Sequence, residues 1–438
     1  MKKLTRTIAA VSALAMSVGA LSACGGSNVN ADKGHVYFLS MKVEQQDQFK
    51  ELAEKFTKKT GIQVDIATAS SDTYEQSLKS ELAKSEAPTL FDVDNNDFLN
   101  WTDYYADMSG TNIYKDQENP DYALKDGDTV GAVPYVMERY GIIYNKKLLQ
   151  KYFDSSWASI KSVDSINNFK TLKTVADEIQ AHKDEMGVKG AFTSAGFDSS
   201  SDWRFKTHLA NLPLYYEFKD DNVTEQPATI KGTYLPNYKK IFDLYITDST
   251  TDPTQLSAKT GDDANSEFAL GEAAFYQNGT WAWTDLQKAG MKAESVGMMP
   301  IYTGVKGEEK QGLATGSENY WCINDKASDA DKKATEDFLS WVITSDTGKK
   351  AISQDMGFTT PFKTFDDVKF DNPLTEAAVE DQKSGKTQVS WNFTMMPSEE
   401  WKNKVGQALL EYAQGTGKWD AVKTAFVDGW ASEYEASH

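Results

Sequence analysis

Apolar residues between positions 35 and 93 follow strand and helix spacings in alternation. Apolar runs predict strands at 35–39, 62–66 and 90–93, and helical spacing predicts helices at 46–60 and 73–85. The first of these helices carries apolar residues at i, i+3, i+4 and i+7 and is followed by a glycine, a common helix end. This β-α-β-α-β order predicts an α/β domain with a largely parallel sheet. In such sheets, ligands bind beyond the carboxyl ends of the strands.

The same alternation continues through the rest of the chain. A short strand is expected at 141–144, and the apolar face of 165–180 predicts a helix with Asp164 or Ser165 as its N-cap. A further helix is expected near 334–342, and 196–202 is interpreted as a polar loop rather than a linker between domains. The sequence contains no internal repeat.

The first 24 residues have the pattern of an export signal. A positively charged start is followed by an apolar stretch over 8–20, which is too short to cross a bilayer as a helix. The stretch ends in Leu-Ser-Ala-Cys, the pattern of a bacterial lipobox, so residues 1–23 are expected to be a lipoprotein signal peptide. Cys24 would then carry lipid, and 24–33 would be a flexible tether. The alternative is an ordinary secretory signal in which Cys24 has no role.

Composition narrows the classes of partner. The 438 residues are enough for two or three domains, and the formal net charge of -19 makes nucleic acid and anionic lipid headgroups poor partners. No segment after the signal is apolar for long enough to span a membrane, so lipid on Cys24 would be the only membrane attachment. If Cys24 is acylated, Cys322 has no partner for a disulfide, and its apolar neighbours predict a small buried side chain.

Motifs for catalysis, cofactors and metals are not evident. The four histidines are far apart in sequence, and there is no GxSxG or CxxC motif. The spacing of Asp92, Asp94 and Asn96 resembles the start of a calcium loop. Asp97 stands where that loop needs glycine, however, and Asp103 where it needs glutamate. We therefore expect no cofactor and no metal.

Three segments carry a more specific signal: PYVMERYGIIYNKKLL at 134–149, EFALGEAAFYQNGTWAWTDL at 267–286 and VGMMPIYTG at 296–304. Together they resemble the family 1 extracellular solute-binding proteins of bacterial ABC importers, among them the maltose-binding proteins. The chain departs from that pattern at Tyr135, where an aliphatic residue is usual. It departs again at 312–324, which lacks the glycine-rich turn common in maltose binders. Maltose itself is therefore not assumed as the ligand.

The resemblance implies a periplasmic-binding-protein-like type II fold, in which two α/β lobes are joined by crossing hinge segments with the ligand in the cleft between them. Mapped by order onto this chain, lobe one would comprise 34–137 and 298–343, and lobe two would comprise 140–296 and 345–438. The hinge would lie at 138–141, where Gly141 would accommodate the backbone change of closure.

The resemblance also implies a set of ligand-binding residues. A sugar ring offers an apolar face for aromatic stacking and a rim of hydroxyls for polar groups. Trp281 matches the sugar-stacking tryptophan of the family, whereas Trp283 is the better candidate for the core. Glu138 matches an acid of the cleft, with an ion pair to Arg139 as the alternative. The remaining candidates are loop or wall residues that could instead be helix caps or core: Glu44, Gln45, Asn96, Asp97, Trp203, Arg204, Asn278, Tyr320 and Trp391.

The function implied is that of a lipid-anchored, monomeric binding subunit that passes an oligosaccharide to an ABC permease and catalyses no reaction. It would work at the extracellular face of the cytoplasmic membrane, and a lipoprotein anchor favours a Gram-positive organism. Three alternatives remain open. An acidic cleft with aromatic residues also suits a cation such as a polyamine, two carboxylates could serve a surface glycoside hydrolase, and the chain could be a purely structural lipoprotein.

Overall fold

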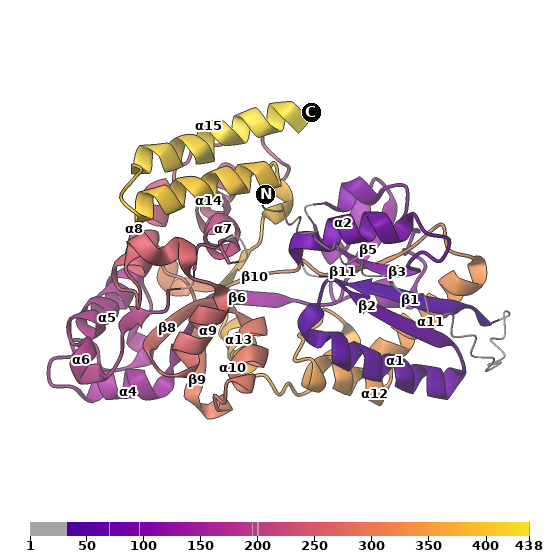
Figure 1. Cartoon of the computed structure of the whole chain (residues 1–438), viewed down its shortest axis with the longest axis horizontal. Helices are drawn as coiled ribbons and strands as arrows, with labels where there is room; N and C mark the ends of the chain where they lie inside the picture. Colours follow the sequence, from indigo (N-terminus) through magenta and orange to yellow (C-terminus); the bar gives the residue numbers. More distant parts are fainter. Residues whose placement is uncertain (1–32, 70, 96, 195, 199–200, 438) are drawn as a thin grey trace, which may run out of the picture.

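Two α/β halves, each built on its own sheet, make up the part of the chain that the structure describes (Figure 1). The structure is a computed structural model that describes residues 33–437 except 70, 96, 195 and 199–200. We call the two halves the first and second lobes. Among the described residues, no helix is long and apolar enough to cross a membrane.

The first lobe contains a six-stranded sheet in the order β2-β1-β3-β11-β5-β4. Strands β2, β1 and β3 run parallel, as predicted, but β11 pairs antiparallel with both β3 and β5, so the sheet is mixed. The strands are β1 His35–Ser40, β2 Gln63–Thr68, β3 Leu90–Val93, β4 Leu124–Asp126, β5 Thr129–Pro134 and β11 Tyr320–Ile323. The helices are α1 Gln46–Thr60, α2 Ser71–Leu82, α3 Asn112–Lys115, α11 Asp329–Thr344 and α12 Asp346–Lys350.

Apolar spacing accounts for how these elements pack. Helix α1 buries Phe49, Leu52, Ala53 and Phe56, the four positions predicted from the sequence, and ends at Gly61 in the left-handed conformation. Cys322 is fully buried in β11, as predicted. The strands and helices predicted between positions 35 and 93 are thus confirmed, with ends shifted by a few residues.

The second lobe has β6 at its centre, in a sheet of order β12-β10-β6-β8-β7 with β9 also paired to β6. The strands are β6 Glu138–Asn145, β7 Gly190–Phe192, β8 Ala273–Gly279, β9 Val296–Met299, β10 Gln311–Gly316 and β12 Thr387–Ser390. The helices are α4 Lys146–Asp154, α5 Phe169–Ala181, α6 Lys183–Met186, α7 Asn211–Asp221, α8 Leu235–Thr247, α9 Gly261–Ala269, α10 Trp283–Lys288, α13 Pro373–Lys383, α14 Glu399–Ala413 and α15 Trp419–Ser437.

One helix start differs from the prediction. Helix α5 begins at Phe169 because the Asn168 side chain accepts a hydrogen bond from the Thr171 amide at 3.0 Å. Asp164 and Ser165 belong instead to a separate 3₁₀ turn, Val163–Ser165.

The chain crosses between the lobes in three segments. The first joins β5 to β6, the second joins β10 to β11, and the third leads from α12 to α13. Gly141, expected to provide hinge freedom, lies inside β6 opposite Asn278. A Cβ at this position would come within 2.5 Å of the Met299 carbonyl oxygen, so close packing within the sheet explains this glycine.

The sheets divide the chain differently from the expected lobe boundaries. Strands β9 and β10 pair with β6 and belong to the second lobe, although 298–343 was assigned to the first. Conversely, apolar side chains from 351–365 pack in the core of the first lobe, although 345–438 was assigned to the second. The reason is that the second crossing lies at 317–319 and the third lies between 365 and 373, both after the positions inferred by order.

Candidate functional site at the crossing segments

Three half-buried tryptophans gather at one end of the second lobe. Trp203 precedes the helical turn Arg204–Leu209, Trp281 lies in the turn Thr280–Ala282, and Trp391 follows β12. The ring centroids of Trp203 and Trp281 are 5.8 Å apart, and the His208 ring lies 5.7 Å from Trp281 and 5.0 Å from Trp391. We call Trp203, Trp281 and Trp391 the aromatic wall. The structure thus brings together three residues that the sequence singled out separately.

Two glycines, Gly279 and Gly316, lie directly against indoles of this wall, and we call them its seats. A Cβ at Gly279 would lie 2.0 Å from the Trp281 ring, and a Cβ at Gly316 would lie 2.6 Å from the Trp391 indole. Each indole therefore rests directly on a glycine backbone, which a larger residue would prevent.

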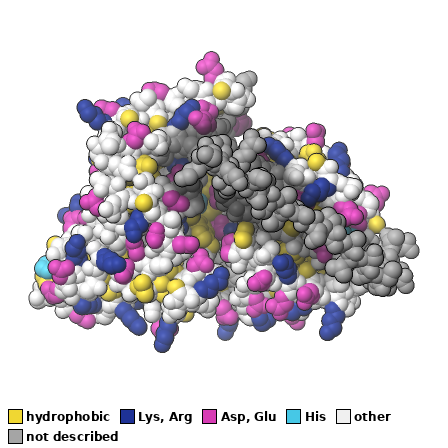
Figure 2. Space-filling view, in the orientation of Figure 1, with side chains coloured by type: hydrophobic (Ala, Val, Ile, Leu, Met, Phe, Trp, Pro, Cys, Tyr) yellow, Lys and Arg dark blue, Asp and Glu magenta, His cyan; other side chains and the backbone are white. Residues whose placement is uncertain are grey.

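The register of the sheet places the wall beside the crossing segments. Gly279 pairs with Tyr140 in β6, and Gly316 pairs with Glu138, the first residue of that strand. Both seats therefore lie where the chain enters or leaves the second lobe. In Figure 2 the surface is recessed between the two lobes, and hydrophobic side chains are visible in that recess.

A buried polar network supports the wall from behind. The Arg204 guanidinium lies 4.2 Å from the Trp203 ring centroid and donates to the Tyr276 hydroxyl at 3.2 Å. Asn278 Nδ2 donates to the same hydroxyl at 2.6 Å, and Asn278 Oδ1 accepts from the Gly279 amide. Arg204 and Asn278, which were predicted to contact ligand, are both buried and hold the wall in place.

Glu138 stands at the start of β6, directly after the first crossing segment, and forms a largely buried ion pair with Lys42. The distance from Lys42 Nζ to Glu138 Oε1 is 2.7 Å, and Asn319 Nδ2 donates to the second carboxylate oxygen at 3.3 Å. Burial by itself lowers the pKa of Lys42, but the carboxylates of Glu138 and Glu44 outweigh it and raise the pKa to about 12. Neighbouring residues of a strand point to opposite faces, so Arg139 turns away and donates to Gln382 at 3.2 Å. The ion pair with Arg139, considered from the sequence, is therefore replaced by one with Lys42.

A second acid, Glu318, lies on the crossing segment between β10 and β11. Burial and the nearby carboxylates of Asp94 and Glu138 raise its pKa to about 8, and the cations of Lys402 and Lys42 counteract this rise. The pKa of Glu318 therefore depends on charged groups of both lobes.

The loops after β1 and β3 reach the same crossing segments. Lys42 follows β1, and Asn95, which follows β3, donates to the Ser317 carbonyl at 3.2 Å. At the ends of these strands, Asp92 Oδ2 accepts from the Ser40 hydroxyl, the Met41 amide and the Tyr135 hydroxyl at 2.7–3.1 Å. Burial raises the pKa of Asp92 to about 7, although these hydrogen bonds lower it. The unusual Tyr135 thus has a structural explanation, because it also stacks on Trp321 at 4.4 Å.

The other first-lobe candidates lie in these two loops. Glu44 is exposed, and Gln45 is buried in the turn before α1. Asp97 is half-buried, and burial together with the Asp94 carboxylate raises its pKa to about 7. Asn96 lies outside the described residues. So do Cys24, the signal peptide expected at 1–23 and the tether expected at 24–33, except for its last residue, Lys33.

Two predicted residues lie in hydrophobic cores. Trp283 is 5% exposed and packs in the core of the second lobe, which agrees with the alternative favoured for it from the sequence. Tyr320 is buried in the first lobe among Leu39, Phe91 and Val93. Neither belongs to the aromatic wall.

Four residues of the site were not predicted from the sequence: Lys42, Tyr140, His208 and Glu318. Each stands within five residues of a predicted candidate, and Tyr140 lies inside one of the family motifs. His208 is buried between Tyr140 at 4.5 Å and the wall. Burial and the neighbouring cations of Arg204 and Lys402 hold its pKa well below the ordinary range.

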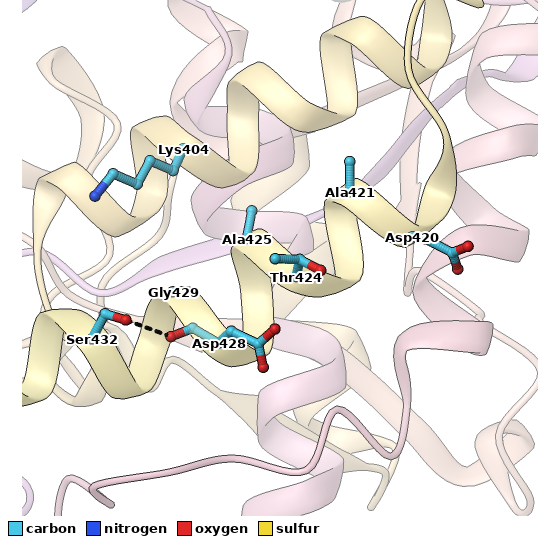
Figure 3. Close-up of a pocket in the computed structure, with 8 residues that line it drawn as sticks. All are labelled: Lys404, Asp420, Ala421, Thr424, Ala425, Asp428, Gly429 and Ser432. Carbon is cyan, nitrogen blue, oxygen red and sulfur yellow. Dashed lines mark hydrogen bonds between the residues drawn. The ribbon is translucent and has the colours of Figure 1, made fainter.

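A separate hollow of about 590 Å³ lies between α14 and α15 (Figure 3). It is lined mainly by small residues of α15, and Lys404 at its edge pairs with Glu433 at 2.8 Å. Within the described part of the chain, no group of three or more histidine, cysteine or acidic side chains could hold a metal ion. The residues at the crossing segments therefore remain the candidate site.

The family model described as "Bacterial extracellular solute-binding protein" matches residues 51–380. The melibiose/raffinose/stachyose-binding protein MelE of Bacillus subtilis is 25% identical over 222 residues, which is 49% of this chain and 48% of MelE. The chain thus matches about half the length of this relative.

Solved structures resemble nearly the whole chain. The solute-binding protein RafE in complex with raffinose has a TM-score of 0.70 and 18% identity, covering 91% of this chain and 99% of RafE. A sugar transporter protein of Bacillus licheniformis in complex with stachyose has a TM-score of 0.63 and 18% identity, covering 91% and 100%. This likeness confirms the type II fold expected from the sequence, with two α/β lobes joined by crossing segments.

Proposed function

Because the chain belongs to the bacterial extracellular solute-binding proteins, we propose that it captures an oligosaccharide between its two lobes and delivers it to an ABC permease. Binding would close the lobes on the ligand through movement at the three crossing segments. The similar proteins named for raffinose, stachyose and melibiose support a sugar as ligand.

The observation that carries this proposal is the aromatic wall on its two glycine seats. A sugar ring has an apolar face that stacks on an indole, and tryptophan provides a large contact area at a small entropic cost. Trp203, Trp281 and Trp391 are each half-buried, so each of these residues keeps some surface that a ligand could contact. Three indoles within one cluster fit a ligand of more than one sugar ring better than a monosaccharide.

Polar residues of the first lobe and of the crossing segments would hold the sugar hydroxyls. Glu44 and Asp97 lie in the two loops that reach the crossing segments, and Glu318 lies on one of those segments. Carboxylates make strong hydrogen bonds to hydroxyl donors. We therefore propose stacking by the second lobe and hydrogen bonding by the first.

Members of this family and the similar structures are solute-binding proteins rather than enzymes. We extend this to the chain itself and propose that it leaves its ligand unchanged. Glu138 supports this view, because its two carboxylate oxygens already accept from Lys42 and Asn319. A glycoside hydrolase needs two carboxylates free to act on the glycosidic bond.

Export, lipid attachment at Cys24 and partnership with a permease are part of the same proposal. They rest on the lipobox pattern at 21–24 and on the family. Mass spectrometry of the N-terminal peptide from native membranes tests the lipid directly. A Cys24→Ala variant should be lost from the membrane fraction, and its retention there would contradict the proposal.

Ligand identity is tested by a thermal-shift screen of residues 25–438, which include every core residue of both lobes. Raffinose-type and other oligosaccharides are compared with polyamines, amino acids and metal ions. A ligand at 100 times its dissociation constant should add about 2.7 kcal/mol to the free energy of unfolding. Stabilisation by an oligosaccharide that stays intact supports the proposal. A shift with polyamines alone, or hydrolysis of the sugar, would contradict it.

A further inference from the structure

A cluster of lysines at one end of the first lobe contrasts with the acidic character of the chain. Lys58 and Lys59 form the last turn of α1, with Lys55 one turn earlier, and Lys350 lies at the end of the adjacent α12. Lys33 joins them, because its Nζ donates to the Thr60 carbonyl at 3.0 Å. We call these five lysines the basic patch. All five are exposed, in a chain of net charge -19.

The basic patch surrounds a shallow hollow with an indole at its base. The hollow measures about 430 Å³, and Trp341 and Thr347 line it together with four of the lysines. Lys59 Nζ lies 5.9 Å from the Trp341 ring centroid, and the indole N–H has no acceptor among the described residues. Tryptophan is enriched at membrane–water interfaces, where its amphipathic ring lies at the level of the headgroups.

Part of the positive charge is not neutralised within the protein. Lys55 pairs with Glu51, and Lys350 pairs with Asp355 and feels the charge of Asp371. Neither Lys58 nor Lys59 has a carboxylate partner within the described part of the chain. These two lysines are therefore available to a negatively charged surface.

The position of the basic patch along the chain suggests which surface this is. Lys33 stands nine residues after Cys24, and a segment of that length spans at most about 30 Å. If lipid on Cys24 holds the chain at the membrane, the end of α1 is kept close to it, because Lys33 contacts Thr60 at that end. The basic patch would then lie well within reach of the headgroups, although the acidic body as a whole is repelled by them.

We propose that the basic patch rests on anionic phospholipid headgroups and so orients the tethered protein on the membrane. This rests on the proposed attachment at Cys24, and it concerns a surface distinct from the aromatic wall. Lysines near an anionic membrane are attracted to it over roughly a Debye length, and salt screens that attraction. The lipid on Cys24 would supply the anchorage and the basic patch the orientation.

The experiment fixes the anchor chemically, so it does not depend on native lipidation. A chain beginning at Cys24 retains every core residue of both lobes. Its Cys24 thiol is coupled to maleimide-bearing lipid, and Cys322 is spared because it is fully buried. One set of vesicles contains about 30% phosphatidylglycerol, which gives a negative surface potential. The other set contains phosphatidylcholine alone. Lysine acylation rates are read by mass spectrometry against the uncoupled protein.

We expect Lys58 and Lys59 to be acylated at least about threefold more slowly on phosphatidylglycerol vesicles, with recovery at high salt and no effect on phosphatidylcholine. Lys146 and Lys147, an exposed adjacent pair on the second lobe, provide the internal control. Equal rates for the two pairs on phosphatidylglycerol vesicles would overturn the proposal. So would equal protection on both vesicle types, because proximity alone would then explain it.

Matched variants separate the charge of the patch from the tether. We also expect Lys55 and Lys350 to be acylated more slowly on phosphatidylglycerol vesicles. In a Lys58→Gln, Lys59→Gln variant this protection should be lost, whereas a Lys146→Gln, Lys147→Gln variant should keep it. Unchanged protection in the first variant would count against the patch. Sugar binding by both variants is measured separately, so a failure of the proposed function is not mistaken for a failure of this inference.

Discussion

The indole of Trp281 lies on the backbone of Gly279, so close that a Cβ at position 279 would come within 2.0 Å of the ring. A residue two positions before the tryptophan therefore decides whether the indole can lie in the aromatic wall. Gly316 has the same relationship to Trp391, which is distant in sequence. The geometry of the proposed site thus depends on two residues that have no side chain to offer a ligand.

Gly279→Ala should displace the Trp281 ring while the fold is retained. The added methyl group overlaps the ring, and overpacking of this kind forces neighbouring side chains off their rotamers. We expect oligosaccharide affinity to fall by about 2 kcal/mol, as for loss of an aromatic anchor. Calorimetry measures the affinity, with Gly110→Ala as the control, since a Cβ there meets nothing within 4 Å. Unchanged affinity in the Gly279 variant would show that ligand binding does not depend on the position that Gly279 gives to the Trp281 ring.

Much of this arrangement could be predicted from the sequence, for identifiable reasons. Helical spacing determined α1, and the resemblance carried by 267–286 identified Trp281. The partner of Glu138 could not be predicted, because Lys42 lies 96 positions away and meets it only where the loop after β1 approaches the start of β6. The close packing of Gly141 could not be predicted, because it comes from the Met299 carbonyl, which sequence proximity does not reveal. The lobe boundaries failed for a similar reason, since pairing of β10 with β6 decides them.

Glu138→Gln should destabilise the protein markedly. The Lys42 and Glu138 side chains are 11% and 6% exposed, and the substitution would leave the largely buried Lys42 ammonium group with only the more distant Glu44 carboxylate, at 4.0 Å. Breaking a buried pair from one side costs about 3–5 kcal/mol, whereas replacing both partners by apolar residues is often close to neutral. Denaturant unfolding should therefore show a larger loss for Glu138→Gln than for the double variant Lys42→Met, Glu138→Leu. Equal stability of Glu138→Gln and the unsubstituted protein would show that the pair is not buried in solution.

His208 should make the protein sensitive to mild acid. Burial lowers its pKa in the folded state, so below about pH 6.5 the unfolded chain binds a proton that the folded protein excludes. The free energy of unfolding should therefore fall as the pH decreases from 7.5 to 5.5, by up to about 1.4 kcal/mol per pH unit from this group. His208→Gln should reduce that dependence when urea unfolding is compared at the two pH values. An identical pH dependence in the variant would contradict a neutral, buried His208.

Asp92 should contribute the opposite slope. Burial raises its pKa from 3.8 to about 7, so between these values the folded protein keeps a proton that the unfolded chain has lost. Its contribution to stability is therefore present at low pH and declines as the pH rises toward 7. As the pH rises from 5 to 7, the stability of Asp92→Asn relative to the unsubstituted protein should therefore increase, because asparagine does not titrate. Its amide oxygen can still accept from Ser40 and Tyr135. A constant difference between the two proteins across this range would show that Asp92 does not titrate there.

The central claim is that an oligosaccharide binds by stacking on the aromatic wall. Calorimetric titration of residues 25–438 with raffinose-type oligosaccharides tests it most directly when Trp281→Ala is measured beside Trp157→Ala. Trp157 stacks on His182 at 3.9 Å and does not belong to the wall. We predict one-to-one binding that Trp281→Ala weakens by about 2–4 kcal/mol, that Trp157→Ala leaves intact and that salt barely affects. Equal affinity of the two variants, or binding only of polyamines with a steep dependence on salt, would contradict the account.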